Sequence, residues 1–159
     1  TLRCYVDDRA YFLGRRRAIH AFTSRNALTS YLGDDRNHDL TGLSTFDSVV
    51  DAAQANKLAL PIPPHNTYTL TGLSRDIESG VDAVDAVQLG LAGELALDIG
   101  DYTGDEAILE AFRAEQPVAQ LISSITGGGE VSDETILTAA VLWRRVERRL
   151  RAHLRPVTS

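Results

Sequence analysis

Four carboxylates in the middle of the chain are spaced so that they could do chemistry together. They follow one another at intervals of three or four residues: Glu94, Asp98, Asp101 and Asp105. On a helix this spacing places side chains on one side, where clustered carboxylates could bind a divalent cation or share acid and base roles. A calcium-binding loop, however, needs glycine at its sixth position and an oxygen ligand at its first, and counting back from Gly104 puts Ile99 first. The spacing therefore predicts a hydrated acidic helix face in preference to a metal site.

Other catalytic and cofactor sites have characteristic residue patterns, which the sequence lacks. A carboxylate-bridged di-metal centre needs Glu-x-x-His motifs, yet no histidine falls within the acidic stretch. Cys4 is the sole cysteine, and the sequence contains neither a Gly-x-Ser-x-Gly turn nor a phosphate-binding glycine loop. We expect no catalytic residue, no metal and no cofactor, and we rank an enzyme behind two kinds of binding protein.

The acidic residues are concentrated in one block of the chain. Fourteen of the 22 carboxylates lie between Asp76 and Glu134, where Arg113 is the only basic side chain. Such a block repels phosphate backbones, and no stretch approaches the ~18 unbroken apolar residues of a membrane span. The sequence therefore predicts neither nucleic-acid binding nor membrane insertion. A lone cysteine needs no oxidising compartment, so we expect a cytoplasmic protein.

The first third of the chain has the composition of short strands. Residues 4–7, 10–13 and 18–22 are rich in strand formers and are separated by turn residues, which predicts an antiparallel meander. From residue 81 onward apolar residues recur at helical spacing, and further helices begin at Asp105 and Pro117. Strands followed by helices predict the α+β class, with a small antiparallel sheet packed against a mainly helical C-terminal two-thirds.

The last helix is expected over residues 133–155 and is both amphipathic and basic. Its apolar seam consists of Ile136, Ala139, Trp143, Val146, Leu150 and His153, with arginines between them. The seam is typical of a helix that docks on its own domain, but a partner or self-association helix and a nucleic-acid or membrane patch remain alternatives. We expect residues 1–159 to form a single domain. Because the chain begins at Thr1, we expect it to be a fragment of a longer protein.

Three stretches carry a family resemblance: YFLGRRRAIHAFTSRNALTSYL at 11–32, HDLTGLSTFDSVVDAA at 38–53 and VDAVQLGLAGELALDIGDYTGDEAI at 84–108. Together they resemble an actinobacterial family often labelled primosomal protein, and most closely the SatS C-terminal domain of the mycobacterial accessory SecA export pathway. The resemblance implies a cytoplasmic chaperone that binds export substrates before translocation and protects them without ATP. Its implied partners are unfolded or partly folded export substrates and the export machinery. It transfers no catalytic or ligand residues.

A chaperone of this kind needs exposed apolar surface ringed by charge, so that a bound client stays soluble. The helical part offers more apolar faces than one small sheet can cover, and we expect some of them to form a groove rimmed by acid. The expected client-binding residues are Leu91, Leu95, Ile99, Tyr102, Ile108, Phe112, Leu121 and Ile125. The same residues could instead form the core. The alternative function is an interaction domain that is not a chaperone and that uses the C-terminal helix.

Overall fold

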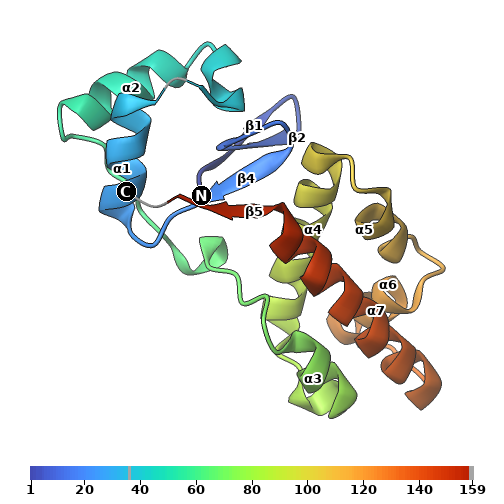
Figure 1. Cartoon of the computed structure of the whole chain (residues 1–159). Coiled ribbons are helices and arrows are strands. Elements are labelled where there is room, and N and C mark those ends of the chain that lie inside the picture. Colours follow the sequence, from blue (N-terminus) through green and yellow to red (C-terminus); the bar gives the residue numbers. More distant parts are fainter. Residues whose placement is uncertain (36, 158–159) are drawn as a thin grey trace. The chain divides into compact units, whose positions relative to one another are not determined.

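The computed structural model describes residues 1–35 and 37–157 and divides into two compact units (Figure 1). Unit 1 consists of Thr1–Ile62 and His153–Ser159, and unit 2 is Pro63–Ala152. Each unit contains its own cluster of buried apolar residues. A compact unit is not by itself a separately folding domain, so the single domain expected over residues 1–159 stays a prediction.

Unit 1 contains two small sheets where the sequence predicts one meander. Strands β1 (Arg3–Val6) and β2 (Arg9–Phe12) form an antiparallel hairpin. The second sheet has the order β3 (Gly14–Arg15), β4 (Ala18–Ala21) and β5 (Leu154–Pro156), and β5 lies parallel to β4. The parallel strand comes from the far end of the sequence, so local patterns in the first third could not reveal it.

Leu13 joins the two ladders of unit 1. Its amide donates to the carbonyl of Leu2 at 2.8 Å, and its own carbonyl accepts from the amide of His20 at 2.8 Å. Both hairpins turn through two residues with positive φ, Asp7–Asp8 and Arg16–Arg17. Two positive φ angles are typical of the type I′ turn, whose twist matches that of the flanking strands. The strand positions expected from the sequence are therefore close to those observed, whereas the pairing differs.

Two helices cover the core of unit 1. Helix α1 (Arg25–Asp34) begins after Ser24, whose hydroxyl accepts from the amide of Ala27 at 3.1 Å. The 3-10 turn η1 (Asp39–Gly42) and helix α2 (Phe46–Gln54) follow. The buried cluster consists of Leu13, Leu28, Leu32, Leu40, Phe46, Val50 and Ala53.

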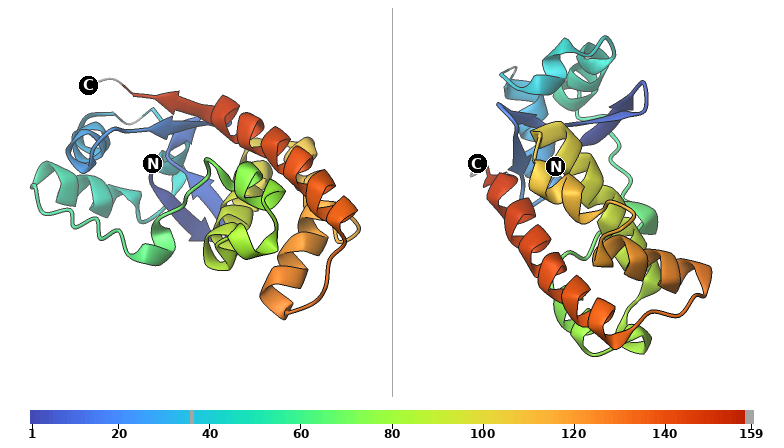
Figure 2. Two further views of the ribbon diagram at one scale, coloured as in Figure 1. Left: turned by 90° about the horizontal axis from the view of Figure 1, so that it is seen from below. Right: turned by 90° about the vertical axis from the view of Figure 1, so that its right-hand side faces the viewer.

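Unit 2 is built from helices (Figure 2). Its elements are η2 (Pro64–Asn66), α3 (Leu73–Glu78), η3 (Val81–Ala83), α4 (Ala86–Thr103), α5 (Glu106–Ala111), α6 (Pro117–Gly127) and α7 (Asp133–His153). Helix α4 begins later than the apolar pattern suggests because Asp85 caps it, its carboxylate accepting from the amides of Val87 and Gln88 at 3.0 Å. With the two sheets of unit 1, these helices make the chain an α+β protein.

Helix α7 ends two residues earlier than the range 133–155 predicted for it. The chain leaves the helix after His153 because Leu154 pairs with Ile19 at the start of β5. The predicted apolar seam of α7 is its buried face: Ile136, Ala139, Trp143, Val146 and Leu150 are all at most 8% exposed, and His153 is half-buried. This is the arrangement expected of a helix that docks on its own protein.

Small residues let α4 approach its neighbours closely. A Cβ atom added at Gly100 would lie 2.9 Å from Cδ2 of Leu109 on α5, and one at Gly93 would lie 3.2 Å from Cδ1 of Ile122 on α6. Both glycines lie on the buried face of α4, so they serve helix packing. Gly90 differs, because a Cβ atom there would meet nothing within 4 Å.

Candidate functional site

The outer face of α4 is the place where apolar and acidic side chains meet at the surface of unit 2. Two apolar side chains of α4 are exposed on this face: Val87 is 69% exposed and Leu97 is 41% exposed. Along the same face, at intervals of three or four residues, come the carboxylates of Glu94, Asp98 and Asp101. We call the seven residues Val87, Gly90, Leu91, Glu94, Leu97, Asp98 and Asp101 the α4 outer face.

The acidic stretch has two roles in the structure. The carboxylates on the α4 outer face are exposed or half-buried, as expected for a hydrated helix face. Asp105 differs from them: its side chain is 3% exposed, caps α5 through the amides of Ala107 and Ile108, and accepts from Nε of Arg149 at 2.8 Å. Among residues 1–35 and 37–157, no three His, Cys, Asp or Glu side chains come together in a way that could hold a metal ion.

The eight expected client-binding residues fall into two groups that differ in burial. Ile99, Ile108 and Leu121 are at most 3% exposed and belong to the interior. A client could touch these three only if the helices separated, so in this structure they are core residues. The other five are half-buried: Leu91, Leu95, Tyr102, Phe112 and Ile125. A role in client binding stays a prediction for these five.

The five half-buried residues divide into two groups, one on α4 and the other made of Phe112 at the end of α5 and Ile125 on α6. Leu91, Leu95 and Tyr102 follow Val87 at intervals of four and seven residues, so they form one flank of the α4 outer face. Phe112 instead packs edge-on against Trp143, with ring centroids 5.9 Å apart, and Ile125 also packs against the core cluster that contains Trp143. The first group is continuous with the exposed Val87 and Leu97.

Sequence reasoning missed the most exposed apolar residues of unit 2. Val87 lies in the stretch where apolar residues recur at helical spacing, but the buried face of α4 is centred on Ala92, Ala96 and Gly100, which leaves Val87 outside. On α7, Leu137 is 57% exposed and Val141 is 44% exposed. Seven of the eight residues from Ile136 to Trp143 are apolar, so any single seam leaves some of them facing water. This excess of apolar residues is the signal from which exposed apolar side chains on α7 could have been predicted.

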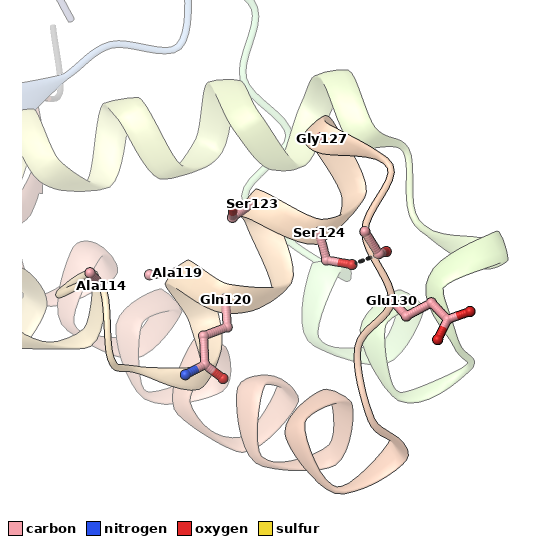
Figure 3. Close-up of a pocket in the computed structure, with 8 residues that line it drawn as sticks. Ala114, Ala119, Gln120, Ser123, Ser124, Gly127 and Glu130 are labelled. Atoms are coloured by element: carbon pink, nitrogen blue, oxygen red, sulfur yellow. Dashed lines mark hydrogen bonds between the residues drawn. The ribbon is translucent and has the colours of Figure 1, made fainter.

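Two shallow pockets flank the loop between α6 and α7. One has a volume of about 640 Å3 and is lined by α6 residues and the loop (Figure 3). The other, of about 470 Å3, is lined by Val81, Ile125 and Val131 together with the loop. Ser124 holds the loop by donating its hydroxyl hydrogen to the carbonyl of Gly129. Among the described residues that line these pockets, Glu130 is the only ionisable side chain, so they bring no acid and base together.

Unit 1 contains a cluster of aromatic rings around two histidines. The His38 ring lies 4.7 Å from the Phe46 ring and 6.1 Å from the Tyr31 ring, and His20 lies 5.4 Å from Tyr31. Burial lowers the pKa of both histidines, and the charges of Asp35 and Asp39 oppose that effect. Burial, together with the hydrogen bond to Asp35, raises the pKa of Tyr31 to about 12. His38 and Phe46 are buried, whereas the rings of His20 and Tyr31 are half-buried.

Taken together, these features describe an α+β protein whose helical unit has exposed apolar side chains beside carboxylates. A family model, the SatS C-terminal domain, matches residues 1–157, and the chain belongs to that family. A crystal structure described as the SatS C-terminal domain in complex with bromine is similar to this chain at 40% sequence identity and a TM-score of 0.88. The match covers 98% of this chain and 85% of that one. No curated protein matches the sequence.

Within residues 1–35 and 37–157, no helix is both long enough and apolar enough to cross a bilayer.

Proposed function

We propose that the chain is the client-binding domain of an ATP-independent protein export chaperone of the accessory SecA pathway. The observation that carries the proposal is the α4 outer face, which exposes Val87 and Leu97 beside three carboxylates in a member of the SatS family. In this proposal the protein acts in the cytoplasm, holds unfolded or partly folded export substrates, and hands them to the export machinery. It is not an enzyme and needs no cofactor or nucleic acid.

Apolar contact supplies the binding energy in this proposal. Burial of apolar surface contributes about 25 cal/mol per Å2, from which the ordering of a flexible client must be subtracted. Val87 and Leu97 offer surface that the fold leaves in water, and the half-buried Leu91, Leu95 and Tyr102 extend it along one flank. A surface of this size gives weak, reversible binding, which suits a chaperone that must release its client. The groove expected from the sequence stays a prediction, and in this proposal the α4 outer face and this flank take its place.

The carboxylates have two functions in the proposal. Glu94 and Asp101 are exposed next to the apolar side chains, so their hydration opposes aggregation of the chaperone itself. Their charge also attracts basic segments of a client, such as the positively charged front of a signal peptide. Because surface attraction of this kind is screened by salt, the apolar contacts set the residual affinity at high ionic strength.

The experiment measures how well the protein suppresses aggregation of an unfolded export substrate. The double substitution Val87→Ser and Leu97→Ser removes apolar surface that is already exposed, so the fold is retained while binding weakens by about tenfold. The matched control is Leu137→Ser with Val141→Ser, which removes similar surface from α7. Equal loss of suppression in both variants, or no loss in the first, would show that the α4 outer face is not the client site.

The alternative function, an interaction domain that uses the C-terminal helix, needs a different surface from the one the sequence indicates. The apolar seam of α7 is occupied by the protein's own core, and Leu150 is 1% exposed. A substitution such as Leu150→Asp would therefore unfold the protein and could not report on partner binding. The exposed face of α7 is the part of this helix that remains available to a partner.

A further inference from the structure

The exposed face of α7 has an ordered sequence of side chains that is not used by the proposed function. At intervals of three or four residues it presents Glu134, Leu137, Val141, Arg145 and Arg148, all of them exposed. Acid therefore lies at one end of the stripe, apolar side chains lie in the middle, and base lies at the other end. We call these five residues the α7 stripe.

Two of the other arginines of α7, Arg144 and Arg149, already have partners inside unit 2. Arg144 pairs with Glu78 of α3, and Arg149 pairs with the buried Asp105. Within the part of the chain that the structure describes, Arg145 and Arg148 form no such ion pair, and neither does Glu134. The charges of the α7 stripe are thus available to a partner, whereas those beside it hold the helix in place.

We propose that the α7 stripe is a self-association surface, on which two copies of this chain pair their α7 helices antiparallel about a two-fold axis. An antiparallel pair centred near residue 139 brings Leu137 of each copy beside Val141 of the other. The same register places Glu134 of each copy beside Arg145 of the other. In a two-fold interface each contact occurs twice, so the four apolar side chains are flanked on both sides by opposite charges.

Charge complementarity selects this arrangement over the others open to the same helix. A parallel pair would place Arg145 beside Arg145 and Glu134 beside Glu134, which is repulsive at both ends. Pairing of the α7 stripe with the α4 outer face of another copy is also complementary in charge, but it is not reciprocal and would lead to open chains of copies. A helix of 21 residues is about 30 Å long, so the contact is small and the dimer is weak.

A charge exchange between the two ends of the stripe tests this arrangement. Sedimentation equilibrium over a range of concentrations up to about 1 mM measures the mass, which is 17.3 kDa for one chain. Glu134→Arg or Arg145→Glu alone places like charges together twice, so each raises the dimer dissociation constant by about tenfold. The two substitutions in one chain restore opposite charges and return the constant to within about threefold of the original. Glu115→Arg, an exposed reversal on the loop before α6, leaves it unchanged.

Circular dichroism of each variant confirms that α7 remains folded, since all the altered side chains are exposed. A wild-type protein that stays monomeric over this range overturns the proposal. A mass that grows beyond two chains favours the open arrangement and also overturns the proposed dimer. A double variant whose dissociation constant does not return toward that of the wild type overturns it as well. None of these outcomes bears on client binding by the α4 outer face, because the substitutions leave α4 intact.

Discussion

His38 is a buried histidine that the fold holds without hydrogen-bond partners for its ring. It is 4% exposed, and neither ring nitrogen has a partner of acceptable geometry within the described residues, although the Asp35 backbone lies close enough to favour the protonated form. The ring packs against Phe46 on α2 and Tyr31 on α1. Its place in unit 1 therefore depends on the ring being neutral.

This arrangement predicts that unit 1 loses stability as the pH falls below neutral. Burial lowers the folded-state pKa of His38 below the unfolded value of about 6.5, despite opposing effects from Asp35 and Asp39. The neutral ring thus contributes stability that is complete above pH 6.5 and declines as the pH falls toward the lowered pKa. His38→Phe removes that decline while His20, whose pKa is lowered in the same way, retains its share.

Urea unfolding at pH 7.5 and pH 5.5 measures the difference between the wild type and this variant. Trp143 is the only tryptophan and lies in unit 2, so its fluorescence follows that unit, while far-ultraviolet circular dichroism follows both. We expect the stability of His38→Phe to fall less between pH 7.5 and pH 5.5 than that of the wild type, and we expect this difference in the unfolding curves followed by circular dichroism. A variant whose midpoint falls by the same amount as that of the wild type would show that His38 is not responsible.

At the residue scale, the sequence predicted local chemistry well and burial poorly. Glu94, Asp98 and Asp101 are exposed or half-buried, as the spacing of the carboxylates predicts. The apolar spacing of α4, by contrast, is compatible with more than one buried face. Which face is buried depends on where α5 and α6 lie, and that arrangement does not appear in a local pattern. For this reason Val87 is exposed and Ile99 is buried.

At the element scale, two glycines of α4 differ in their surroundings: one is closely packed against a neighbouring helix, and the other is not. Gly100 faces Ile108 and Leu109 of α5, whereas Gly90 faces open space. In a helix interior alanine is favoured over glycine by about 1 kcal/mol when nothing obstructs its methyl group. The two positions therefore offer a matched comparison within one helix.

We predict opposite effects on stability from the same substitution at these positions. Gly90→Ala raises the free energy of unfolding by about 0.5 to 1 kcal/mol, because the helix gains propensity without a clash. Gly100→Ala lowers it by about 1 to 3 kcal/mol, because the added methyl group would lie 2.9 Å from the Leu109 side chain and 3.1 Å from that of Ile108, so that these packed side chains must shift. Urea midpoints followed by Trp143 fluorescence measure both, and a shift of the same sign in the two variants contradicts this account of α4 packing.

Element boundaries could be predicted where a capping side chain marks them. Asp105 begins α5 and Pro117 begins α6, both as the sequence indicates. The end of α7 could not be predicted in this way, because it is fixed by the pairing of β5 with β4, a contact between residues more than 130 positions apart. Five of the six residues predicted for the seam of α7 are buried, because a strict helical period that includes Trp143 and Leu150 leaves one buried face, and His153 is half-buried.

On the scale of the whole molecule, the carboxylates of the acidic block have two kinds of surroundings. Part of the acidic block is structural, since Asp105 and Glu78 bind arginines of α7. The remainder includes the carboxylates of the α4 outer face, where apolar side chains also reach water. The sequence predicted that more apolar helix surface exists than the fold can bury, and also the α+β class. It did not predict which residues remain outside, because that depends on the packing of all the helices.

The central claim is that the α4 outer face contacts unfolded clients, and a site-specific photocrosslinker tests it most directly. The probe is attached to Val87→Cys in a chain that carries Cys4→Ala, with Glu115→Cys on the loop before α6 as the comparison site. The account predicts that an unfolded export substrate crosslinks at least about tenfold more to position 87 than to position 115, and that the folded substrate crosslinks to neither. Equal crosslinking at the two positions, or none at position 87 while aggregation is still suppressed, would contradict it.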